Sequence, residues 1–169
     1  MTQYCPSCSE MICSPIGSSE FLLIVYGAPT REDMLRGIPF STNPNYMGEG
    51  KIMRKELERA GASLSEFRVT SLWMHEPSKN ESCWQAGYDH VLDEAKGKQA
   101  ILLVGSDAVE AFTEYKVSDV TGLQVDSAVL SAPIIYAMVS PGLALSRSLG
   151  EVRFGIEKFI ARLQKEGLL

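Results

Sequence analysis

The chain has 169 residues, of which 45% are apolar and 22% charged, so it can form one globular domain with a sizeable core. Its net charge of −5 argues against a generally basic protein that coats nucleic acid. No apolar run is long enough to span a membrane, and the first residues lack the pattern of a signal peptide, so we expect a cytoplasmic protein.

Two segments nevertheless concentrate basic residues. They contain Lys51, Arg54, Lys55 and Arg59, and Arg147, Arg153, Lys158 and Arg162. These side chains can form a local basic groove, or they can be the solvated faces of two helices, and composition alone favours the solvated faces.

Strands and helices are predicted to alternate along the chain. The apolar run Phe21–Pro29 is typical of a strand that is buried on both faces. The elements expected after it are a helix over Gly48–Ser63, a strand over Phe67–Met74, a helix over Ser82–Lys98, a strand, glycine turn and helix over Gln99–Tyr115, a strand over Ser131–Gly142 and a helix over Glu151–Gly167. This order predicts a single α/β domain over residues 1–169, with three αβα layers around a central, mostly parallel four-stranded sheet.

The stretch Val25–Phe40 is unusual, because it follows the most apolar strand and shows almost no helical character. We interpret it as a long turn. Ligands of open parallel sheets bind at the carboxyl ends of the strands. The sequence therefore places the candidate site in three loops, Gly27–Phe40, Ser71–Pro77 and Ser140–Ser146.

These loops contain motifs in a fixed order. The first loop has Tyr26-Gly27-Ala28-Pro29-Thr30, then Glu32-Asp33 and Gly37-Ile38-Pro39-Phe40, and it is followed by Gly48-Glu49-Gly50-Lys51. The second loop has Thr70-Ser71-Leu72-Trp73-Met74-His75-Glu76-Pro77. After it come Leu103-Val104-Gly105-Ser106-Asp107-Ala108 and, in the last loop, Ser140-Pro141-Gly142-Leu143-Ala144-Leu145-Ser146-Arg147. Together with an N-terminal Cys-x-x-Cys, the series resembles the uracil-DNA glycosylase superfamily, most closely its iron–sulfur family 4 branch, over nearly the whole chain.

The resemblance implies a pocket for a base flipped out of DNA. Its base- and DNA-binding residues would be Ala28, Pro29, Phe40, Ser71, Ser140, Pro141, Leu143 and Arg147. Phe40 would stack on the base, although a core phenylalanine is an equally good interpretation. Leu143 or Leu145 would be a wedge between bases, unless these leucines begin the core face of the last helix, and Arg147 would lie beside a phosphate.

Three positions that carry chemistry in that family hold other residues here. Gly27 stands in place of an acidic residue that positions water, Ser71 in place of an asparagine that reads the base, and Ser140 in place of a histidine that stabilises the leaving group. Losing one preorganised donor typically costs about two to three orders of magnitude in rate. We therefore assign no catalytic residue and expect weak or lost excision. Glu32 or Asp33 could replace the acid, but the matching family positions support the loop.

The resemblance also implies a metal site. Its ligands would be Cys5, Cys8, His75 and Cys83, which would hold a [4Fe–4S] cluster or, as an alternative, a zinc ion. Cys13 is a spare thiol that could replace His75. Residues 1–20 contain few apolar residues, so we expect the metal to anchor them.

The leading functional expectation is a DNA-binding accessory to replication or repair. By analogy with viral and phage systems its partner could be a DNA polymerase, and a phage-encoded chain would act in the host cytoplasm. The alternatives are an active DNA glycosylase with altered base specificity and a protein-interaction module that does not bind DNA.

Overall fold

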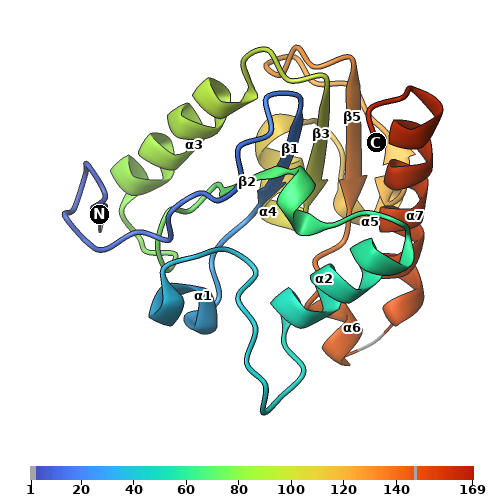
Figure 1. The fold of residues 1–169 in the computed structure, drawn as a ribbon. Helices are drawn as coiled ribbons and strands as arrows, with labels where there is room; N and C mark the ends of the chain where they lie inside the picture. Colours follow the sequence, from blue (N-terminus) through green and yellow to red (C-terminus); the bar gives the residue numbers. More distant parts are fainter. Residues whose placement is uncertain (1–2, 147) are drawn as a thin grey trace.

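The structure, a computed structural model, describes residues 3–146 and 148–169, which form one twisted sheet with helices on both faces (Figure 1). The five strands lie in the order β2-β1-β3-β5-β4. Their bounds are β1 Leu22–Tyr26, β2 Arg68–Ser71, β3 Ala100–Val104, β4 Leu123–Gln124 and β5 Ile134–Met138. The first, second, third and fifth of these pair in parallel, while β4 pairs antiparallel with β5.

The α/β class and the parallel pairing of the four predicted strands are confirmed, but the expected number of four strands is wrong. The additional strand, β4, has only two residues and both are exposed. A segment this short has no periodic hydrophobic pattern, so the sequence gives no signal for it.

Helices cover both faces of the sheet and make the layers of the fold. They are α1 Arg31–Arg36, α2 Glu49–Arg59, α3 Glu81–Ala95, α4 Ser106–Phe112, α5 Val117–Val120, α6 Leu143–Ser146 and α7 Leu149–Lys165, with a 3-10 turn at Leu64–Glu66. One core joins α2 and α7 to strand residues such as Ile24 and Leu102. The other core joins α3 and α4 to the strand residues that follow Ile24 and Leu102 in the sequence, Val25 and Leu103. Successive strand residues thus point to opposite layers.

The stretch after β1 differs from its predicted long turn, because Arg31–Arg36 forms the helix α1. The hydroxyl oxygen of Thr30 accepts from the backbone N–H of Asp33, and the Asp33 carboxylate accepts from the backbone N–H of Thr30. Gly37 ends the helix with a φ of 69°. This capping box stabilises a helix that is too short to show a hydrophobic period.

The N-terminal segment runs along the β2 edge of the sheet and passes beside α3. Ile16 forms an antiparallel bridge with Val69 of β2, and the N–H of Cys13 donates to the carbonyl oxygen of Met74 over 2.7 Å. These contacts bring Cys5 and Cys8 to the loop that follows β2.

The sheet has one point at which the direction of strand addition reverses. From β1 the chain adds β2 on one side and later adds β3 on the other, so the carboxyl ends of β1 and β3 leave a crevice between their loops. In Figure 1 the strand arrows point toward the end of the molecule that carries α1 and α6. Within the described residues, no helix combines the length and apolar character that crossing a membrane requires.

Candidate functional site

A cavity of about 280 Å³ lies at this reversal point. Its walls come from the ends of β1 and β3, the loop after α1, the first turns of α2 and α4, and the loop after β5. The lining residues are Tyr26, Gly27, Ala28, Pro29, Thr30, Phe40, Glu49, Val104, Gly105, Ser106, Asp107, Ser140 and Pro141. Six residues assigned to the site from the sequence therefore lie together: Gly27, Ala28, Pro29, Phe40, Ser140 and Pro141.

Phe40 forms one wall of the cavity in a strained backbone conformation. Its φ is 49°, a left-handed value that bulky residues rarely adopt, and its side chain is 1% exposed. The ring packs against that of Tyr26, with centroids 4.8 Å apart and planes inclined by 39°, and it belongs to the hydrophobic core, as the alternative interpretation of Phe40 expects. Strain of this kind persists only where the surroundings fix the residue, and it concentrates at binding sites.

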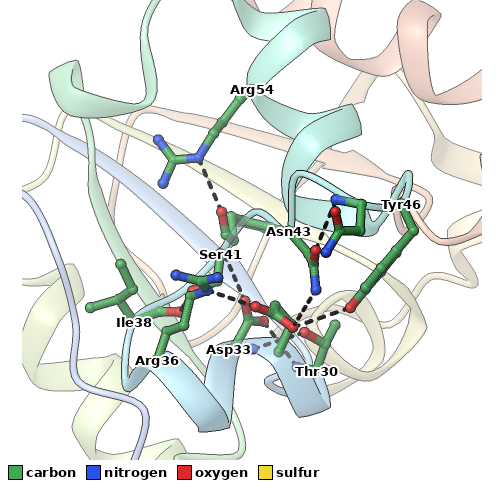
Figure 2. A network of polar contacts seen from close by, with 11 residues as sticks. Thr30, Asp33, Arg36, Ile38, Ser41, Asn43, Tyr46 and Arg54 are labelled. Atoms are coloured by element: carbon green, nitrogen blue, oxygen red, sulfur yellow. Dashed lines mark hydrogen bonds and ion pairs between the residues drawn. The ribbon is translucent and has the colours of Figure 1, made fainter.

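Two hydrogen bonds to the peptide unit that joins Phe40 to Ser41 hold the strained conformation (Figure 2). Arg54 on α2 donates from Nε to the carbonyl oxygen of Phe40 over 3.0 Å. The N–H of Ser41 donates to Oδ1 of the buried Asp33 over 2.7 Å. Gly50 lets the first turn of α2 approach so closely that a Cβ there would collide with the backbone of Phe40 and Ser41. Asp33 thus supports the loop and is not among the residues that line the cavity.

Two carboxylates line the cavity from positions that sequence reasoning did not select. Asp107 lies in the first turn of α4, and a Cβ built on Gly27 would be 3.0 Å from the Asp107 Cβ. The Asp107 side chain therefore occupies the space next to Gly27. Glu49 begins α2, and burial raises the pKa of its carboxyl, to which the charge of Asp33 adds.

The two serines have different places. Ser140 lines the cavity, where its hydroxyl donates to Oε1 of Glu49 over 3.4 Å and accepts from the N–H of Gly142 over 3.2 Å. Ser71 ends β2 with 3% exposure and is not among the residues that line the cavity. Ser71 is instead the strand partner of Tyr26, which does line the cavity, so it lies next to that residue on the side of β1 away from the crevice.

The loop after β5 forms the short helix α6. Leu143 is half-buried and packs against the core beneath α2 and α7, whereas Leu145 is 54% exposed. The exposed leucine is thus the one free to contact a ligand. Arg147, assigned to a phosphate, lies outside the described residues.

The predicted metal ligands come together at the N-terminal end of α3. One donor atom from each of Cys5, Cys8, His75 and Cys83 lies within 4.8 Å of all the others. Three segments meet here: the N-terminal turn, the loop after β2, and α3, where Gly87 lets the helix approach the Leu72 carbonyl closely. This group could hold a metal ion.

The orientation of His75 suits a ligand. Its Nδ1 lies 2.8 Å from the carbonyl oxygen of Glu76 and 3.4 Å from a carboxylate oxygen of Glu10. A carbonyl oxygen only accepts, so Nδ1 carries the proton and Nε2, which is 3.4 Å from the Cys8 sulfur, has a free lone pair. Metal-binding histidines typically use such a partner to fix the ring.

The thiols in this region have perturbed pKa values. Burial raises the pKa of the Cys5 thiol, but hydrogen bonds from the Ser7 and Cys8 backbone outweigh this effect. The net result is a pKa lowered to about 7. Burial and the neighbouring thiols raise the pKa of Cys83 to about 12. Cys13 does not join the group; it is buried with its sulfur 3.5 Å from the Tyr26 hydroxyl, so the proposed exchange of Cys13 for His75 is wrong.

Sequence reasoning missed Glu49 and Asp107. Each lies in the first turn of a helix at the carboxyl edge of the sheet, and that position was the available signal. No protein-family model matches the chain, and a search of curated proteins finds no match either.

Proposed function

We propose that this chain is a DNA-binding protein of the uracil-DNA glycosylase type, with weak or absent uracil excision, that assists DNA replication or repair. The observation that carries the proposal is the cavity between β1 and β3, walled by the strained Phe40. At about 280 Å³ it has room for one nucleobase taken out of the helix stack.

Weak excision follows from the residues at the chemical positions. Ser140 donates to Glu49 and is a poorer stabiliser of a developing anion than a histidine. Ser71 is buried at the end of β2 and does not reach the cavity, so it does not read a base there. Without an amide group to pair with the edge of uracil, the cavity offers little selectivity for that base.

A second candidate function is an active glycosylase with a different base preference. Glu49 and Asp107 favour it, because carboxylates can position water and accept hydrogen bonds from the amino groups of a base. Uracil presents carbonyl oxygens where such amino groups stand, so two carboxylates in this cavity disfavour uracil itself.

For the metal centre we propose one zinc ion bound by Cys5, Cys8, His75 and Cys83. The resemblance alone favours a [4Fe–4S] cluster, whose four ligands bind four different irons and therefore stand farther apart than the ligands of a single ion. The ligands of a single tetrahedral zinc stand about 3.8 Å apart, because each lies about 2.3 Å from the ion. The spacing within 4.8 Å supports the single ion.

DNA binding and base excision together test the function. Purified protein is titrated into fluorescent single-stranded and duplex oligonucleotides at several salt concentrations, and the same DNA carrying uracil is assayed for excision in single turnover. We expect salt-dependent binding with excision near background. Efficient release of another base would support the second candidate, and absence of DNA binding would favour a protein-interaction module. Capture from the native cell would then identify a polymerase or another protein partner.

A further inference from the structure

A groove with three basic side chains lies next to the cavity. It has a volume of about 410 Å³ and is lined by Thr42, Asn43, Pro44, Lys51, Arg54, Lys55 and Glu58. The basic residues project from α2 at positions i, i+3 and i+4, and the polar residues belong to the loop after α1. With Glu58 at one end, the groove carries a net charge of +2 in a protein whose net charge is −5.

These three cations are not used by the fold as ion-pair partners. Among residues 3–146 and 148–169, Lys51, Arg54 and Lys55 make no ion pair within 4.0 Å. Six other basic residues pair with carboxylates: Arg36, Arg59, Arg68, Lys96, Arg153 and Arg162. Among the described residues, Arg31, Lys79, Lys98, Lys116, Lys158 and Lys165 also make no ion pair, but none of them lines this groove. What distinguishes Lys51, Arg54 and Lys55 is that they lie together in one groove, where their positive charges add and favour an external anion.

One short segment joins the groove to the cavity. Phe40 lines the cavity, Thr42 lines the groove, and Arg54 of the groove holds the carbonyl oxygen of Phe40. Figure 2 shows Arg54 reaching from α2 toward this segment. Along the helix, Glu49 of the cavity and Lys55 of the groove are six residues apart, which is about 9 Å at 1.5 Å per residue. A ligand a few nucleotides long spans this distance.

We propose that this groove binds the phosphates of a single DNA strand whose base enters the cavity. The inference rests on the proposed function, since it assigns the strand a path across the protein. Lys51, Lys55 and the free guanidinium nitrogens of Arg54 face the phosphates, and Arg54 couples the groove to the position of Phe40.

The test replaces the two lysines and leaves Arg54 in place, because that side chain also holds the loop. Each phosphate contact to a single strand contributes about 0.7 to the slope of log K against log salt. Lys51→Ala with Lys55→Ala should lower the slope for an oligothymidine by about 1.4 and weaken binding about 25-fold at 0.1 M salt. Lys51→Arg with Lys55→Arg should bind like the wild type, since the charge remains.

A matched control removes two lysines elsewhere. Lys79 and Lys116 are exposed and, among the described residues, also lack ion pairs, so Lys79→Ala with Lys116→Ala changes the net charge equally. This control should keep the affinity and slope of the wild type. If the half-buried Lys51 proves necessary for folding, Lys55→Ala alone should weaken binding about fivefold and lower the slope by about 0.7.

The outcomes separate the groove from the function. If the wild type binds DNA and the groove variant binds equally well, the groove proposal is overturned while the proposed function stands. If the wild type binds no DNA, both fail. Displacement of the oligonucleotide by polyglutamate at equal charge concentration would assign the groove to acidic polypeptides and overturn the proposal as well.

Discussion

Glu49 connects the cavity to the pH dependence of stability. Burial raises the pKa of its carboxyl above the ordinary value of 4.5, so in the window above 4.5 the folded chain holds a proton that the unfolded chain has lost. Stability therefore falls as pH rises through this window. Glu49→Gln removes the titration, and we expect its melting temperature to gain on that of the wild type between pH 4 and pH 7.

Thermal melts at four pH values measure this difference, with Glu58→Gln on the exposed face of the same helix as the control. A difference between wild type and Glu49→Gln that stays constant across the range would contradict the assignment. The same residue has a bearing on ligand binding, because a carboxyl with a raised pKa in a cavity is a candidate for proton transfer.

Sequence reasoning located the residues that follow strands but not those that begin helices. Gly27 and Ser140 line the cavity as expected, because each lies within a motif close after a strand, and Phe40 does so from the loop after α1. Asp107 was missed because it reaches the space beside Gly27 only through the packing of α4 against β1, which no spacing along the chain reveals. Ser71 ended its strand as expected, yet the order of strands keeps it away from the cavity.

At the scale of elements, length decided what the sequence could predict. The four parallel strands and the helices α2, α3, α4 and α7 have apolar runs or stripes long enough to recognise. The short elements α1, α5 and β4 do not, and α1 depends on side-chain capping. Local capping thus explains why the stretch after β1 contains a short helix rather than only a turn. Asp33 of this cap also bonds the backbone next to Phe40, which lines the cavity.

The capping box of α1 can be tested at its first residue. Thr30→Ala removes the oxygen that accepts from the N–H of Asp33 over 3.2 Å, and a lost N-cap costs about 1 kcal/mol. In a chain of this size that corresponds to a fall in melting temperature of about 2–4 °C. Thr30→Ser keeps the acceptor and should melt close to the wild type. Equal melting temperatures for the alanine and serine variants would show that the cap contributes nothing.

At the scale of the whole molecule, alternation of strands and helices predicts the layers, whereas the proposed metal centre depends on long-range contacts. Cys5 and Cys8 meet His75 and Cys83 only because the N-terminal segment follows the edge of the sheet. Periodicity in the sequence does not encode such a meeting, and the resemblance to a metal-binding family supplied it. Few apolar side chains hold this segment: its cluster consists mainly of Cys5, Ile12, Met74 and Cys83.

Removal of the proposed zinc ion should therefore loosen one end of the molecule before the rest. A site assembled by folding contributes its binding free energy to stability, so a metal-free chain should melt earlier. We expect about one zinc per chain by elemental analysis in the wild type and in Cys13→Ser, and none in Cys83→Ser. In Cys83→Ser, amide hydrogen exchange should rise first over residues 3–20, while β1 and β3, buried at the centre of the sheet, stay protected. If the purified protein is brown and contains iron, the same four residues hold an iron–sulfur cluster and the zinc proposal is wrong. The site is refuted if the wild-type protein contains no metal and if residues 3–20 exchange equally slowly in the wild type and in Cys83→Ser. The small apolar cluster around Ile12 would then be sufficient to hold the segment.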